Sequence, residues 1–478
     1  MACSSLTGSE CRVNEYIVGN GTLVAFGPPC RLLPGGGVLV QGGVIAATGD
    51  TSALRLAHPG VGFLDARGQY IMPGLICTHT HTYGAFARGM ALKDPPPQDF
   101  MQILQRLWWR LDRVLTPDDV YYSALVCLVD AIRHGVTTLI DHHASPNACD
   151  GSLDVIARAF GEAGLRGSLC YEVSDREGSD KAEAGNRENE RFIKTVRPYL
   201  GVSGDGRGEG QAVSAAAPLL SAMMGLHAAF TLSDETIGEA VSVARRLGVG
   251  CHIHVAEGTA DVDDSLRRGQ ERTIERLQRL GVLGPQTIAA HCIHVDEHER
   301  SVLAETGTLV VHNPRSNMNN AVGTADVSSM LEHGVTVGLG NDGFSNDMFV
   351  EMKAAYLSHK AATADPQAMP ADLVLRLATA NNAHIAGVIF GNVQAPVAFG
   401  DLAPGAPADI VLLDYASPTP VTAGNLPWHI IFGIDGSMVT TTIVNGQVLM
   451  RDRQLLTVDE DAIYARAREQ AVKMWERF

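Results

Sequence analysis

Between residues 73 and 395, eight short apolar runs alternate with stretches whose apolar residues recur at helical spacing, and this alternation constrains the fold more than any other feature. The runs read GLICTHTH, GVTTLIDHH, RGSLCYEV, MMGLHAAF, GVGCHIHVAE, TIAAHCIH, TLVVHNP and VTVGLGND. Parallel strands joined by helical crossovers produce this pattern. Eight such units predict an α/β fold, a (β/α)8 TIM-like barrel.

One of the intervening helices carries clear boundary signals. Residues 115–135 read LTPDDVYYSALVCLVDAIRHG, with Thr116 as a cap, Pro117 in the first turn, two acids and a closing Gly135. These residue types are typical of the start and the stop of a helix. The segment therefore predicts a helix in the register that the strand runs require.

The two ends of the chain have a different residue pattern. Residues 16–72 and 400–450 contain short β-type runs separated by Gly and turn residues. We expect a small β-sandwich built from both chain ends. Residues 16–72 form its first part, residues 73–395 form the barrel, and residues 396–478 form its second part. The second of these segments also includes a C-terminal amphipathic helix. The Gly-rich stretch 202–217 predicts a mobile loop before the fourth barrel strand.

Charge and composition exclude several classes of protein. The 478 residues are 45% hydrophobic, which is typical of a globular chain, and carry a formal net charge of −16 without any basic run. Nucleic acids and anionic membranes need clustered Lys and Arg, so we expect neither as a partner. The most apolar window, 214–230, is short and broken by Pro218, and no signal peptide is seen. A small-molecule partner is favoured.

Cysteine usage bears on the compartment. Nine cysteines are an odd number, and none shows CxxC spacing. Neither a disulfide framework nor a zinc knuckle is indicated. A reducing, cytoplasmic location fits best.

The runs carry His, Asp or Glu at or near their C-terminal ends, the face where such barrels hold their active sites. His79 and His81 are one residue apart, so on a strand they point to the same side. Taken alone, the pair could equally form hydrogen bonds to nearby carbonyls. Later runs supply the further groups that a metal requires: His252, His254, Glu257, His291 and Asp342.

The favoured ligand set is three imidazoles and a carboxylate: His79, His81, His254 and Asp342. This set fits Zn²⁺ or Fe²⁺ and leaves a position for water. Glu257 and His291 then remain free for proton transfer. For His252, deeper on its strand, core packing is the expected role; His142, His143, His227 and His312 could make supporting hydrogen bonds or contact a substrate.

Lysine positions bear on the number of metals. Barrel hydrolases with two metals commonly bridge them by a carbamylated lysine on a central strand. None of the six lysines lies on a predicted strand; they are Lys93, Lys181, Lys194, Lys353, Lys360 and Lys473. We therefore expect one divalent metal per subunit, zinc first and iron as the alternative.

Taken together, these motifs resemble the amidohydrolase superfamily, in its mononuclear deaminase and chlorohydrolase branch. The segments MPGLICTHTH, HIHVAE, AAHC and GLGNDG occur in the family's order, and the likeness covers nearly the whole chain. Within the branch, LWWRLDR, DHHASP, HNPRSNMNN and NDMFVEMK are similar to an aminohydrolase associated with selenium metabolism and anaerobic purine breakdown.

The resemblance implies the same metal ligands as the residues themselves, with Glu257 as proton shuttle and His291 orienting the attacking water. It also implies that His227 faces the substrate. The expected reaction is deamination of a purine-, pyrimidine- or triazine-like heterocycle by a water activated at the metal, with Asp342 accepting the water's proton. Ring opening of a cyclic amide and dechlorination are the alternatives, and a catalytically silent heterocycle-binding protein is a fourth.

Three further side chains are candidates for substrate contact. Arg88 and Arg315 each follow a predicted strand beside turn residues, and either could bind substrate oxygens or merely tie down its own loop. Of Trp108 and Trp109, we expect one in the core, while Trp109 is a candidate for the roof of the pocket. A homo-oligomer, dimer or larger, is expected.

Overall fold

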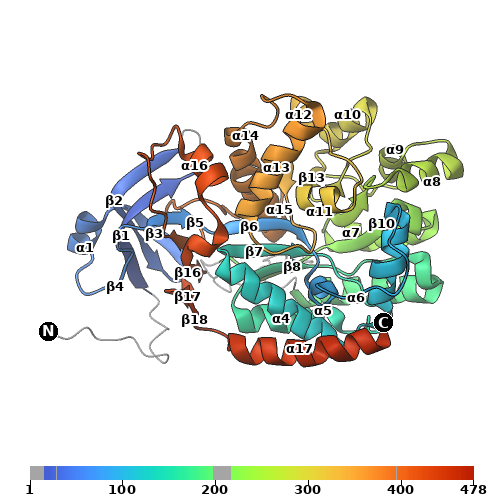
Figure 1. Cartoon of the computed structure of the whole chain (residues 1–478), viewed down its shortest axis with the longest axis horizontal. Helices are drawn as coiled ribbons and strands as arrows, with labels where there is room; N and C mark the ends of the chain where they lie inside the picture. The colour runs from blue at the N-terminus through green and yellow to red at the C-terminus, as the bar shows by residue number, and fades with distance from the viewer. Residues whose placement is uncertain (1–14, 28–29, 197–216, 395) are drawn as a thin grey trace.

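The computed structural model describes residues 15–27, 30–196, 217–394 and 396–478, in which parallel strands alternate with helices (Figure 1). One sheet has the order β6 (Leu75–Thr80), β7 (Val136–Asp141), β8 (Arg166–Leu169) and β9 (Leu220–Ala222). The other has the order β10 (Met224–Ala228), β11 (Cys251–Val255), β12 (Ile288–His291), β13 (Leu309–His312) and β14 (Val337–Leu339). Each of the eight predicted runs contains one of these strands. The expected α/β class with parallel strands is confirmed.

Helices connect and cover the parallel strands (Figure 1). They are α4 (Pro117–Arg133), α5 (Ser152–Ala163), α6 (Ser179–Val196), α7 (Asp234–Leu247), α8 (Thr259–Gly269), α9 (Thr273–Arg279), α10 (Glu297–Thr306), α11 (Pro314–Asn319), α12 (Val327–Glu332), α13 (Met348–Thr363), α14 (Ala371–Arg376) and α15 (Asn382–Phe390). The predicted boundaries of α4 are confirmed, because Thr116 and Asp119 form a capping box and Gly135 follows the helix at φ 75°.

The two parallel sheets approach each other at both edges. Only Met223 separates β9 from β10; its N–H donates to Leu169 O at 3.2 Å, while that of Met224 donates to Gly250 O at 3.0 Å. At the opposite edges, Asn341 N–H donates to His79 O at 3.0 Å. Residue 340 must be glycine here, since a Cβ would lie 2.7 Å from that same carbonyl oxygen.

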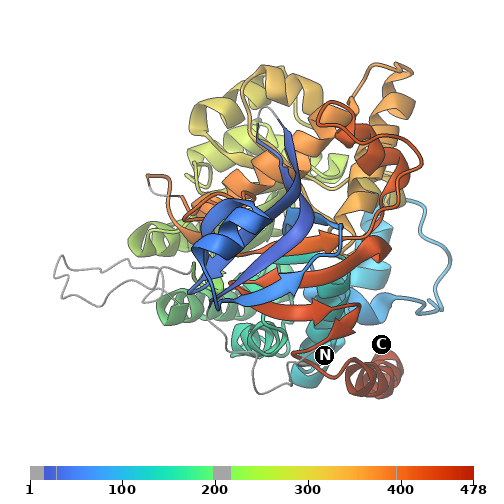
Figure 2. The same cartoon turned by 90° about the vertical axis from the view of Figure 1, so that its left-hand side faces the viewer.

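The two chain ends form a separate nine-stranded sheet. Its main path is β18 (Gln454–Leu455), β17 (Gln447–Arg451), β16 (Val439–Val444), β15 (Ile410–Leu413), β5 (Tyr70–Pro73), β1 (Glu15–Ala25), β2 (Arg31–Gln41) and β3 (Val44–Asp50), with β4 (Gly62–Asp65) paired to β1. Figure 2 shows the first and last segments of the chain side by side. The sheet curls, because Val44 bridges to Pro407 just before β15.

The sheet of the chain ends is bound to the parallel sheets by a buried arginine. Arg166, at the start of β8, places its guanidinium 3.2 Å from the Asp409 carboxylate and donates to Asn445 Oδ1 at 2.6 Å. The predicted C-terminal amphipathic helix is α17 (Glu460–Arg477), and its Gln470 donates to Asp119 of α4 at 2.9 Å. These contacts hold both chain ends against the parallel strands.

Shorter elements complete the described chain: α1 (Thr51–Ala57), η1 (Thr82–Ala87), α2 (Phe100–Ile103), η2 (Leu104–Trp108), α3 (Trp109–Val114), η3 (Asp175–Glu177), η5 (Ala229–Thr231), η6 (Leu377–Asn381), α16 (Leu426–Gly433) and η7 (Gly436–Met438). Among the described residues, the stretch Ala371–Phe390 is long and apolar enough to cross a membrane, but it is 67% buried inside the protein, as a core helix is. The Gly-rich stretch predicted as a loop lies, except for Ala217, outside the described residues.

Candidate metal centre and substrate pocket

Side chains from the C-terminal ends of four parallel strands converge on one point. The Asp342 Oδ1 atom lies 3.0 Å from His79 Nε2 and 2.9 Å from His81 Nε2. The Nε2 atoms of His81 and His254 are 3.2 Å apart. His291 joins from β12, with its Nε2 atom 3.8 Å from Asp342 Oδ2. The structure thus brings together all four predicted ligands and the predicted His291.

Hydrogen bonds on the far side of each ring fix the nitrogen that faces this point. His81 Nδ1 donates to His142 O at 2.6 Å, and His254 Nδ1 donates to His227 O at 2.8 Å. His291 Nδ1 donates to Asn317 Oδ1 at 2.8 Å. In each neutral ring the Nε2 lone pair is therefore free to bind a cation.

His252 lies behind His79, as its predicted deeper position suggested. Its Nε2 atom is 2.9 Å from His79 Nδ1, and both rings are fully buried. Burial lowers the pKa of His79 to about 3, which keeps the ring neutral. A neutral imidazole is the form that binds a metal.

The donor set fits a divalent metal of the zinc type. His79, His254, His291 and Asp342 offer ligand atoms that all lie within 4.8 Å of one another. The buried His291 Nε2 atom has no hydrogen-bond partner in the described chain. Burial would raise the pKa of Asp342, but its close contacts with His291, His79 and His81 outweigh this effect and hold the pKa well below its usual range. Imidazole nitrogens with one carboxylate are typical zinc ligands.

Two residues of this centre have left-handed backbone conformations. His291 has φ 73° and Asp342 has φ 52°. Such values are uncommon for residues other than glycine and cost free energy, of order 1–3 kcal/mol each. The strand ends turn sharply here, so that both side chains point toward His79 and His81.

Glu257 lies beside the metal centre without joining it. Its Oε1 accepts a hydrogen bond from Asn320 Nδ2 at 3.1 Å, and its Oε2 is 3.6 Å from His291 Nε2. Burial raises the pKa of Glu257, and the nearby Asp342 carboxylate raises it further, although His291 opposes them. A carboxyl group with a raised pKa can carry a proton near neutral pH.

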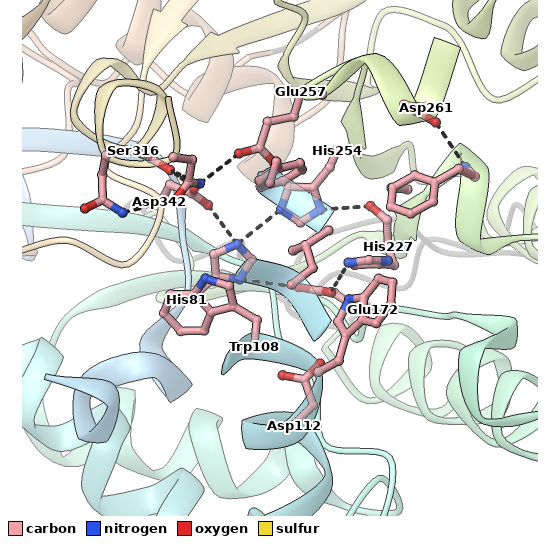
Figure 3. Close-up of a pocket in the computed structure, with 18 of the residues that line it drawn as sticks. His81, Trp108, Asp112, Glu172, His227, His254, Glu257, Asp261, Ser316 and Asp342 are labelled. Atoms are coloured by element: carbon pink, nitrogen blue, oxygen red, sulfur yellow. Dashed lines mark hydrogen bonds and ion pairs between the residues drawn. The ribbon is translucent and has the colours of Figure 1, made fainter. Parts of the chain in front are cut away.

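A pocket with an empty volume of about 820 Å³, partly open to solvent, adjoins the centre. Figure 3 shows Glu257 and Asp342 on one side of the His81 and His254 rings. The segment from α2 to α3 contributes an apolar wall to the pocket: Phe100, Leu104, Trp108 and Trp109. Both tryptophans line the pocket and are half-buried, whereas we expected one of them in the core.

The pocket is also lined by polar groups that the sequence did not single out. Glu172 is 4% exposed and lies 3.7 Å from Nε2 of the predicted substrate contact His227. Asp112 is 2% exposed and pairs with Arg176 at 3.1 Å, while its Oδ1 atom has no hydrogen-bond partner among the described residues. Burial raises the pKa of Asp112 to about 7 despite the opposing charge of Arg176. Glu172 ends the run RGSLCYEV, but only the three-dimensional packing shows that it faces the pocket.

The two arginines predicted to contact substrate are placed elsewhere. Arg88 directly follows η1, and its side chain does not line the pocket. Arg315 donates to Glu351 Oε1 at 2.5 Å and to Ser345 Oγ at 2.8 Å. Its donors are thus engaged in tying down a loop, which is the alternative that the sequence left open. In this geometry neither arginine lines the pocket.

The chain belongs to the amidohydrolase family, whose sequence profile matches residues 70–449. A shorter match, to the imidazolonepropionase-like composite domain of bacteria, covers residues 36–60. The family is therefore confirmed, and the protein is a hydrolase; the deaminase relatives described next confirm the branch.

Individual relatives agree over almost the full length. The 5'-deoxyadenosine deaminase of Methanosarcina mazei is 33% identical over 470 residues, 97% of this chain and 99% of the relative. The 5-methylthioadenosine/S-adenosylhomocysteine deaminase of Desulforudis audaxviator is 34% identical over 445 residues, 92% of this chain and 95% of the relative. A zinc-bound adenosine deaminase structure from Xanthomonas campestris has a TM-score of 0.79 at 26% identity, covering 96% of this chain and 98% of its own.

Proposed function

We propose that this protein is a metal-dependent aminohydrolase that removes an amino group from a purine-like N-heterocycle. The observation that carries the proposal is the position of Glu257, a buried carboxyl beside a cluster of four imidazoles and Asp342, at the floor of a pocket with an aromatic wall. The relatives named as adenosine-type deaminases support this choice of ring.

The proposed metal ligands are His79, His81, His254 and Asp342, and zinc is the proposed metal. A bound divalent cation would supply a water that is activated at neutral pH. The hydrogen bonds from His81 and His254 to backbone carbonyls support the assignment, because they hold the free nitrogen of each ring toward Asp342. One metal per subunit is proposed to suffice for the reaction.

Proton transfer falls to three side chains. Asp342 accepts the proton of the attacking water, and Ser316 Oγ, 2.5 Å from Oδ2, orients the carboxylate. Glu257 passes its proton to the ring nitrogen, the proton that Asp342 took from the water goes to the amino group, which leaves as ammonia, and the hydroxyl on the attacked carbon returns a proton to Glu257. His291, whose Nε2 atom faces both carboxylates, orients the attacking water and the tetrahedral centre that forms from it.

Substrate recognition is proposed to use both the aromatic and the polar side chains that line the pocket. Trp108, Trp109 and Phe100 provide apolar faces against which a flat heterocycle can pack. The unpartnered Oδ1 atom of Asp112 can accept hydrogen bonds from substituents such as sugar hydroxyls. This arrangement supports a nucleoside-sized substrate, while His227 is proposed to contact the ring.

The test is ammonia release against a panel of adenosine, 5'-deoxyadenosine, 5'-methylthioadenosine, guanine, cytosine and melamine, with ultraviolet spectra recorded in parallel. Stoichiometric ammonia with a retained aromatic chromophore is expected for one or more of these compounds. Loss of the chromophore without ammonia from a cyclic amide such as dihydrouracil or hydantoin would instead assign ring opening. Chloride release from atrazine would indicate the dechlorination alternative.

We also propose finer points of architecture and setting. The main-chain contact between Asn341 and His79 supports closure of the two parallel sheets into one (β/α)8 barrel. The curl of the nine-stranded sheet supports the β-sandwich, with boundaries at 16–72, 73–395 and 396–478. The free thiols among the described residues fit a reducing cytoplasm. A homo-oligomer is proposed, to be checked by light scattering.

A further inference from the structure

A second group of metal-binding side chains lies next to the proposed metal centre. Glu172, His142 and His227 come from the C-terminal ends of neighbouring strands, with Glu172 just beyond β8, where Tyr171 bridges to His143. The three side chains are buried, with exposures of 4%, 0% and 8%. Figure 3 shows Glu172 and His227 on the side of His81 opposite to Asp342.

The hydrogen bonds of the two histidines determine which nitrogen faces the carboxylate. His142 Nε2 donates to His252 O at 3.0 Å, so that its Nδ1 carries the lone pair in the neutral ring. That Nδ1 atom lies 3.1 Å from Glu172 Oε1. Neither atom has a hydrogen-bond partner within the described residues.

The same reasoning applies to His227. Its Nδ1 donates to Thr231 Oγ1 at 2.8 Å, since the Thr231 hydroxyl itself donates to Ala228 O at 2.9 Å. The lone pair of His227 is therefore on Nε2, which lies 3.7 Å from Glu172 Oε2. Two imidazole lone pairs and a carboxylate thus face one another.

The nearest possible donor, His81, does not supply a hydrogen bond to Glu172. His81 Nδ1 lies 3.3 Å from Glu172 Oε1, but its proton is directed to His142 O at 2.6 Å. Buried acceptors that face one another without a donor are unfavourable unless a cation or a proton lies between them. His142 and Glu172 belong to a group whose ligand atoms lie within 4.8 Å of one another; its other two members, His81 and His254, are proposed ligands of the first centre.

We propose that Glu172, His142 Nδ1 and His227 Nε2 form a second binding site for a divalent cation of the zinc type. The His142 Nδ1 atom lies 3.1 Å from Oε1 of Glu172 and the His227 Nε2 atom 3.7 Å from Oε2, so an ion between the two rings would be held by both oxygens of this carboxylate. The site uses no ligand atom of the first centre. Its fourth position opens toward the pocket, because Glu172 and His227 both line it.

The second site has fewer protein ligands than the first and therefore binds its ion more weakly. The protein is expected to retain one metal after dialysis and to take up a second when zinc is added. The competing explanation is a protonated His142 paired with the Glu172 carboxylate, which would bind no cation. The proposal stands whether or not the reaction is deamination, because its measurement involves no substrate.

The experiment titrates the dialysed one-metal, full-length protein with ZnCl₂ alone at pH 7.5, using calorimetry and metal analysis. The wild type should bind one further ion, and Glu172→Gln should weaken this second binding at least about tenfold while retaining the first ion. Asp112→Asn is the matched control, since it removes another buried pocket carboxylate outside the group, and it should bind the second ion as the wild type does. His227→Gln should weaken uptake as well, which covers the case of a poorly folded Glu172 variant.

Anomalous diffraction from zinc-soaked crystals locates the ion directly. A second peak between His142, Glu172 and His227 is the expected result. The proposal is wrong if the wild type takes up no second ion, if Glu172→Gln and His227→Gln both bind it unchanged, or if the peak lies elsewhere.

Discussion

Glu257 contacts the pocket from a bent strand end and is not among the proposed metal ligands. Replacing it with Gln keeps the shape and the hydrogen bond with Asn320 but removes the transferable proton. Because proton transfer of this kind contributes roughly 10²–10⁴-fold in rate, Glu257→Gln should turn over at least about a hundredfold more slowly. Metal analysis and substrate binding should remain as in the wild type.

Two outcomes would contradict this assignment of Glu257. Loss of the metal in the Gln variant would make Glu257 a ligand and require a new ligand set. Full activity would show that the reaction does not use this carboxyl group. Steady-state kinetics and metal content, measured on the same preparation, separate these outcomes.

Asp261 sits next to Glu257 and supports a prediction about pH. Its Oδ2 accepts from Ala256 N–H at 2.7 Å and its Oδ1 from Phe230 N–H at 3.0 Å. Burial raises its pKa from 3.8 to about 7 despite these hydrogen bonds. Between these values the unfolded chain has lost a proton that the folded chain retains, so the native state loses stability as pH rises.

The matched variant Asp261→Asn has no such proton. The wild type's free energy of unfolding, relative to the variant's, should fall by about 1.4 kcal/mol per pH unit between about pH 4 and 7 and level off above that range. Urea unfolding at a series of pH values measures this difference. Parallel curves over the whole range would show that Asp261 has an ordinary pKa.

At the residue scale, the side chains of the candidate metal centre could be predicted from sequence, but the carboxylates Glu172 and Asp112 of the pocket could not. The strand pattern gives the direction of His79 and His81, since side chains alternate across a strand. Glu172 and Asp112 follow no such rule, because their orientation depends on how later segments pack over them. The narrower likeness to a selenium-associated aminohydrolase stays a prediction.

Helices α11 and α13 are joined by the Arg315 side chain, which is 13% exposed against a fully buried Glu351. Removing one partner of a buried ion pair leaves the other uncompensated, which typically costs about 3–5 kcal/mol. Arg315→Met should therefore lower stability by roughly 3 kcal/mol, while leaving KM little changed. Arg88→Met is the control on an arginine outside the pocket and should alter neither quantity. A raised KM with normal thermal stability in Arg315→Met would restore the substrate contact.

The helical segment from η2 to α3 supplies the aromatic wall and can be tested by fluorescence. The Arg176 guanidinium lies 5.1 Å from the ring centre of Trp109, and Trp108 lines the same pocket. Binding of a heterocycle should quench this emission, and the double variant Trp108→Phe/Trp109→Phe should lose most of the response. Trp428 and Trp475, 43% and 40% exposed, line no part of this pocket and remain as internal controls. Binding that quenches neither pocket tryptophan would remove support for this wall.

At the scale of helices and strands, the sequence predicted an element's ends where the contacts that fix them are close in sequence. The cap of α4 could be read from Thr116 and Pro117 because its hydrogen bonds span only a few residues. The short strand β9 could not be predicted, since its pairing with β8 depends on the distant Leu169. For Arg88 the sequence left two alternatives open for the same reason: nothing near it in sequence shows which way the chain leaves the pocket.

The whole molecule depends on contacts between distant segments. Arg166 and Asp409 are 243 residues apart, yet their buried pair joins β8 to the sheet of the chain ends. Composition and periodicity could predict two β segments at the chain ends, but not the β5 and β15 pairing that unites them. Such contacts form only after both regions have folded. The sequence pattern therefore predicts the individual segments more reliably than the contacts between them.

The metal content is a property of the whole chain, because the proposed ligands come from three strands of two sheets. We predict about one tightly bound divalent ion per chain in dialysed protein, since the described strands carry no lysine that could bridge two ions as a carbamate. His79→Ala and His254→Ala should each remove that ion together with activity, because each deletes one of the proposed protein ligands. Glu172→Gln should leave it in place. Two ions that survive dialysis, with activity following the second, would show that the reaction needs a binuclear centre and would overturn the single-metal mechanism.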